Sequence, residues 1–107
     1  MKLIVLLYLE DDETCVNDLL GRHDVAVYSR TSVEGIGPGA PGWYGSAAPY
    51  RSRMVIALVE PDLAGEILEA VESGTGLQDS RHPIHALQLD VERQAVCGGG
   101  AGQADES

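Results

Sequence analysis

Three arginines, Arg51, Arg53 and Arg81, stand where an expected loop meets an expected strand. A guanidinium group suits a two-point grip on phosphate or carboxylate, because its N–H donors form a planar fork. The three side chains are therefore candidate ligands for an anion. An equally good alternative is that each forms a surface ion pair with one of the seventeen acidic residues.

The segment 35–46 combines glycines, prolines and two large aromatic residues. Gly35 and Gly37 could bring backbone N–H groups to a phosphate, or they could simply make a loop flexible. No Gly-Lys-Ser/Thr sequence follows, which excludes a P-loop. Trp43 and Tyr44 are candidate partner-docking residues, because aromatic side chains often anchor a partner. The alternative is that they cover a neighbouring subunit.

His82 and His85 are weak candidates for metal ligands. On a strand, residues three positions apart face opposite sides of the sheet, so the two imidazoles are a poor pair for one metal. His85 shares its side with Leu87 and Leu89, which favours a half-buried histidine. The serines lie in no nucleophile elbow, so we expect no catalytic site and no enzyme activity.

The apolar pattern predicts two similar halves, each with a strand, a helix and a second strand. The acidic run 10–13 is expected to begin the first helix by capping free amides. The glycines and prolines of 35–46 exclude a regular element between the halves. The expected elements are a strand over 2–9, a helix from 10–13 to Gly21, a strand over 25–33, a strand over 53–60, a helix from Pro61 to Ser73 and a strand over 83–92.

This order predicts an α+β, ferredoxin-like βαββαβ sandwich, with two helices on one face of a four-stranded antiparallel sheet. The strands 2–9 and 53–60 are apolar on both sides and are therefore expected at the centre of the sheet. Two helices cover only one face. The apolar side chains of the other face need a partner, and a second copy of the chain is the simplest one. We therefore predict a homo-oligomer.

Composition limits the function further. The 107 residues suit one domain, and the net charge of −10 argues against binding to nucleic acid or to an anionic membrane surface. No apolar run approaches the roughly 18 residues of a membrane-spanning helix. The two cysteines, Cys15 and Cys97, fit a reduced, cytoplasmic protein. Residues 97–107 are glycine-rich and then acidic, so a disordered tail is expected behind a domain of residues 1–96.

Over residues 1–96 the sequence resembles the PII-like (GlnB-like) signalling proteins, in particular divergent members associated with transporters. Residues 33–37 are similar to the Gly-x-Gly that opens the family's T-loop, for which 36–52 would be the equivalent. Residues 74–76 are similar to the start of its B-loop, and 82–86 to the approach to its last strand. Pro38 replaces the family's basic residue, and 77–81 replace its phosphate-binding Gly-Asp-Gly-Lys.

The resemblance implies a homotrimer that binds a small ligand, an adenine nucleotide or a small anion, in clefts between subunits. Thr75 and Gly76 would join Gly35, Gly37 and the arginines there. The loop 36–52 would signal to a membrane transporter or its cytoplasmic domain. The alternative is a metal-binding or metal-tolerance trimer of the same fold, similar to the CutA proteins.

Overall fold

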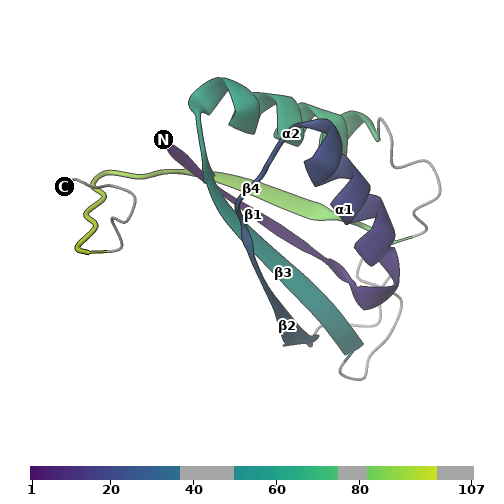
Figure 1. Cartoon of the computed structure of the whole chain (residues 1–107). Coiled ribbons are helices and arrows are strands. Elements are labelled where there is room, and N and C mark those ends of the chain that lie inside the picture. The colour runs from purple at the N-terminus through teal and green to yellow at the C-terminus, as the bar shows by residue number, and fades with distance from the viewer. Residues whose placement is uncertain (37–49, 75–81, 99–107) are drawn as a thin grey trace.

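The computed structural model describes residues 1–36, 50–74 and 82–98. The chain forms a βαββαβ fold in which both helices lie on the same face of one sheet (Figure 1). The predicted fold class is confirmed. Its elements are β1 (Lys2–Leu9), the 3-10 turn η1 (Glu10–Asp12), α1 (Glu13–Arg22), β2 (Ser29–Gly35), β3 (Tyr50–Val59), α2 (Pro61–Ser73) and β4 (His85–Asp90).

The sheet is antiparallel with the strand order β2-β3-β1-β4. The prediction that the first and third strands are central is therefore correct. Alternate residues of β1 face the helices, and Ile4, Leu6 and Tyr8 are completely buried there. Leu19 of α1 and Ile67 of α2 complete this core and are equally inaccessible to solvent. Burying these side chains is the main stabilising contribution to the fold.

The opposite side of the sheet, here called the open face, is apolar and partly exposed. One cross-strand row consists of Leu58, Leu3 and Leu89, and the neighbouring row on this face is also apolar across the same three strands. The sequence predicted burial on both sides of the central strands, but in the single chain Ile56 and Leu58 of β3 are 38% and 40% exposed. The described residues of the open face include Leu3, Val5, Leu7, Ser29, Thr31, Val33, Ser52, Met54, Ile56, Leu58, His85, Leu87 and Leu89.

The second strand begins later than predicted. The alternation of 25–33 suggested one strand, but Val25 is 7% exposed and Val27 is 82% exposed, although both would share one side of a strand. The N–H of Val25 instead donates a 2.9 Å hydrogen bond to the carbonyl of Leu20, at the end of α1. The backbone before Ser29 therefore completes the helix end, and sheet pairing starts only afterwards.

Two other boundaries differ from the prediction. The loop expected over 36–52 ends earlier, because residues 50–52 of β3 pair with 33–35 of β2. The last strand is shorter than 83–92, because β1 pairs with β4 only from Leu7↔His85 to Lys2↔Asp90. The second helix has its predicted bounds. It ends at Gly74, whose φ of 75° is a left-handed conformation that glycine adopts without strain.

Neither helix in the described part of the chain is long and apolar enough to cross a membrane.

Candidate functional site

Arg53 lies on the helix-facing side of β3, close to the acidic turn that follows β1. Its cross-strand neighbour on β1 is Tyr8, and Tyr8 precedes Glu10 by two residues in the sequence. The Nη2 group of Arg53 donates a 3.2 Å hydrogen bond to Oε2 of Glu10. Both side chains keep some contact with solvent, so this ion pair is a surface interaction of modest strength.

Arg51 lies on the same side of β3, two residues before Arg53, and is exposed. Together with Leu9, Glu10 and Asp11 it lines a cavity of about 230 Å³. Glu10 therefore touches Arg53 and also borders the cavity of Arg51. The alternation of β3 places the two candidate arginines on one face, as an anion site requires, with a carboxylate between them.

Two polar atoms at this end of β3 are buried and have no hydrogen-bond partner, Nε of Arg53 and Oγ of Ser52. A buried donor without an acceptor lowers stability, and an added acceptor recovers that loss. Nε of Arg53 is therefore a donor that a bound anion could satisfy. Ser52 is only 4% exposed but belongs to the open face, so it does not share this side with the arginines.

Two neighbouring carboxylates, Asp12 of the turn and Glu13 at the start of α1, contact cationic or polar groups from other elements. Glu13 accepts a 3.0 Å hydrogen bond from the hydroxyl of Tyr8 and forms a 2.9 Å ion pair with Arg30 of β2. Oδ2 of the buried Asp12 lies 3.1 Å from Nδ1 of His82, in the segment before β4. The turn thus connects β1 to β2, β3 and the start of β4.

This arrangement corrects the expectation that the acidic run serves to cap helix amides. The residues at the N-cap positions of η1 and α1 make no side-chain capping hydrogen bond. The carboxylates of Glu10, Asp12 and Glu13 bind distant side chains instead. Sequence reasoning missed these partners, and the available indication was four consecutive acids in a chain with only seven Lys and Arg.

Tyr8 is strongly affected by this environment. Burial raises the pKa of its hydroxyl well above the ordinary value of 10, and the hydrogen bond to the Glu13 carboxylate raises it further. The phenol is therefore a fixed hydrogen-bond donor at all physiological pH values.

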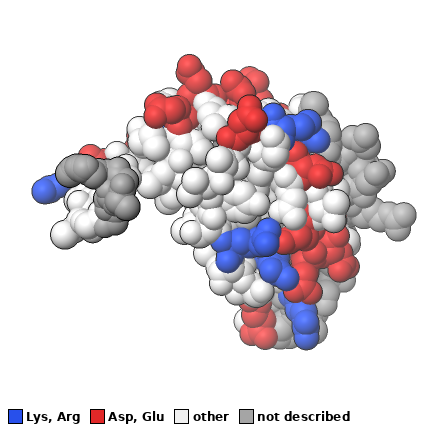
Figure 2. Space-filling model, viewed as in Figure 1, with Lys and Arg blue, Asp and Glu red and all other residues white. Residues whose placement is uncertain are grey.

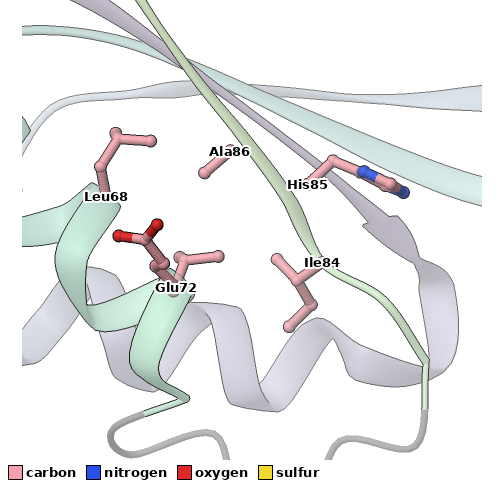
Figure 3. Close-up of a pocket in the computed structure, with 6 residues that line it drawn as sticks. Leu68, Glu72, Ile84, His85 and Ala86 are labelled. Carbon is pink, nitrogen blue, oxygen red and sulfur yellow. The ribbon is translucent and has the colours of Figure 1, made fainter.

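The two histidines that were weak metal candidates lie apart. His82 contacts Asp12, whereas His85 pairs with Leu7 and lies on the open face. Figure 3 shows the His85 ring directed away from Glu72, which lines a groove of about 350 Å³ between α2 and β4. Residues 1–36, 50–74 and 82–98 contain no group of three or more His, Cys, Asp and Glu side chains that could hold a metal ion.

Several residues predicted for the site fall outside the described part of the chain. Gly35 is described and is the last residue of β2, where it pairs with Tyr50. Its backbone is therefore part of the sheet, whereas the sequence placed it in the loop. The predicted site residues outside the described ranges are Gly37, Trp43, Tyr44, Thr75, Gly76 and Arg81.

Charge is distributed unevenly over the surface. In Figure 2, acidic side chains predominate over α2, and basic side chains lie among acidic ones over the part of the molecule where β2, β3 and η1 meet. All charged residues of α2 are acidic, from Asp62 to Glu72. Arg51 and Arg53 therefore offer an anion one of the few cationic positions among the described residues.

The fold is similar to solved structures of PII-like proteins. One is CPII, a nitrogen regulatory PII-like protein from Thiomonas intermedia K12 bound to ADP, AMP and bicarbonate, with a TM-score of 0.58 and 22% identity over 88% of this chain and 94% of that chain. Another is a PII-like signalling protein, described as putative, from Thermus thermophilus, with a TM-score of 0.60 and 17% identity over 84% of this chain and 85% of that chain. No family model matches the sequence, and neither does any curated protein.

Proposed function

We propose that this chain is a PII-like regulatory protein that binds a small anionic ligand, an adenine nucleotide or a small anion, and does not act as an enzyme. The observation that carries the proposal is the placement of Arg51 and Arg53 on one side of β3, next to a cavity and directly after the loop segment. The likeness in fold to CPII, a protein bound to ADP, AMP and bicarbonate, supports this ligand class.

The clefts between copies of a homotrimer would complete the ligand site. The apolar open face supports such an assembly, since it leaves Ile56, Leu58, Leu87 and Leu89 partly in water. In this proposal Gly35, Gly37, Thr75, Gly76 and Arg81 line the cleft with the two arginines.

The output of the proposed regulator is a contact with a membrane transporter, made from the cytoplasmic side by the loop 36–52. Trp43 and Tyr44 would be its docking residues. Ligand binding would select the loop conformation that fits the transporter. The metal-binding alternative gains no support from the described residues, because His82 and His85 do not come together.

The test is a calorimetric titration of the purified protein with ADP, AMP and bicarbonate. We expect binding by the unchanged protein, and an affinity about tenfold lower for Arg53→Ala, because a charge-assisted hydrogen bond is lost. Arg22→Ala, which removes an exposed arginine at the end of α1, is the matched control and should bind normally. Absence of binding by the unchanged protein, or equal affinity of the Arg53 and Arg22 variants, would contradict the proposed site.

A further inference from the structure

We infer that Glu10 is a built-in competitor of the anionic ligand, so that the ligand must displace its carboxylate from Arg53. The inference rests on the proposed function and adds to it a residue that sets affinity. It assigns to the acidic turn a role beyond stabilising the fold.

The contacts of Glu10 support this role. Its Oε2 atom accepts the 3.2 Å hydrogen bond from Nη2 of Arg53, and the residue also lines the cavity beside Arg51. A carboxylate in this position resembles the ligand class that the arginines would bind, because it offers the same charge and the same acceptor oxygens. The guanidinium of Arg53 is thus already occupied on one side.

The contact is also weak enough to be exchanged. The side chains of Glu10 and Arg53 are 37% and 28% exposed, and a surface ion pair of this kind contributes little to stability. Nε of Arg53 remains buried without an acceptor while Glu10 is bound. A phosphate or a bicarbonate that reached both nitrogens would satisfy a donor that Glu10 leaves unsatisfied.

Two other acidic residues serve as controls. They distinguish the effect of a direct contact with Arg53 from a general effect of negative charge on anion binding. Glu34 is the cross-strand neighbour of Arg51 and is exposed, so it lies near the site, whereas the carboxylate that accepts the hydrogen bond from Arg53 is that of Glu10. Glu69 lies on α2, on the acidic side of the molecule. Replacing any of the three by glutamine removes one negative charge at nearly constant volume.

The experiment compares the affinities of Glu10→Gln, Glu34→Gln, Glu69→Gln and Arg53→Ala with that of the unchanged protein, using ADP, inorganic phosphate and bicarbonate as separate probes. Thermal unfolding first verifies that each variant is folded. We expect E10Q to bind the anions about threefold to fivefold more tightly, because the competing carboxylate is gone. E34Q and E69Q should change affinity by less than about twofold.

The outcomes separate the inference from the proposed function. If R53A binds weakly and E10Q binds like the unchanged protein, Glu10 does not compete and the inference is wrong, although the arginine site stands. Weaker binding by E10Q also overturns it, because Glu10 would then position Arg53 for the ligand. Equal gains in all three glutamine variants overturn it in favour of general charge. If no probe binds to any of the proteins, both the proposed function and the inference fail.

Discussion

The fold strongly alters the chemistry of Tyr8. Its ring lies in the core, and its hydroxyl donates to Glu13, which in turn pairs with Arg30. A row of three polar groups therefore connects β1, α1 and β2 at the boundary between core and solvent. The pKa of Tyr8 is raised because ionising the buried phenol next to a carboxylate is unfavourable.

This raised pKa predicts a loss of stability at alkaline pH. Above pH 10 the unfolded chain releases the Tyr8 proton while the folded chain keeps it, so the free energy of unfolding falls as the pH rises. Urea denaturation at several pH values between about 9 and 11.5 measures this slope. We expect Tyr8→Phe to show a shallower decline than the unchanged protein. A decline of equal steepness in the two proteins would show that Tyr8 does not cause it.

At the scale of elements, the acidic turn η1 joins parts of the sheet that are distant in the sequence. Its residue Asp12 is buried and contacts His82, which lies seventy positions later. This contact holds the chain in place where it approaches β4, an edge strand that pairs with β1 alone among the strands that the structure describes. The turn thus fixes the backbone that leads into β4, a strand that has only a short run of residues paired with β1.

Removing the imidazole should therefore weaken the fold. In His82→Ala the carboxylate of Asp12 stays buried without this partner, and we expect a loss of about 1–3 kcal/mol in the free energy of unfolding. His23→Ala is the matched control, because His23 lies 3.6 Å from an exposed carboxylate of Glu66 and should cost less than about 1 kcal/mol. Urea denaturation at neutral pH measures both, and equal losses would show that the Asp12 contact has no special weight.

At the scale of the whole molecule, both helices of the described residues lie on one face of the sheet, and neither of them covers the other face (Figure 1). The thirteen residues of the open face named above include no Asp, Glu, Lys or Arg. A partly exposed apolar surface of this kind is typical of a protein–protein interface. Assembly of several copies would remove it from water.

A charge on this face should prevent assembly. We expect the unchanged protein to have a mass in solution that is a multiple of 11.3 kDa, and Leu87→Asp to have the mass of one chain. Gln88→Asp is the matched control, because Gln88 lies on the same strand but on the other side of the sheet, opposite Ile4. Sedimentation equilibrium measures the masses. A monomeric unchanged protein, or identical masses for the two variants, would show that the open face has another role.

The fold class, the central position of β1 and β3, and the bounds of β1 and α2 could all be predicted from the sequence. These features follow from local patterns, since apolar periodicity, Pro61 and Gly74 act within a few residues. The sequence also singled out Arg51 and Arg53, because their type and their distance from a glycine-rich segment are visible in one dimension.

The surroundings of these residues, in contrast, became known only from the folded structure. The start of β2 depends on a hydrogen bond between Val25 and the end of α1, and the length of β4 depends on where β1 offers partners. The contact of Glu10 with Arg53 joins positions 43 residues apart. Such pairs are set by strand register and by the direction of each side chain. No local pattern encodes the register, so the contact of Glu10 with Arg53 became apparent only in the folded chain.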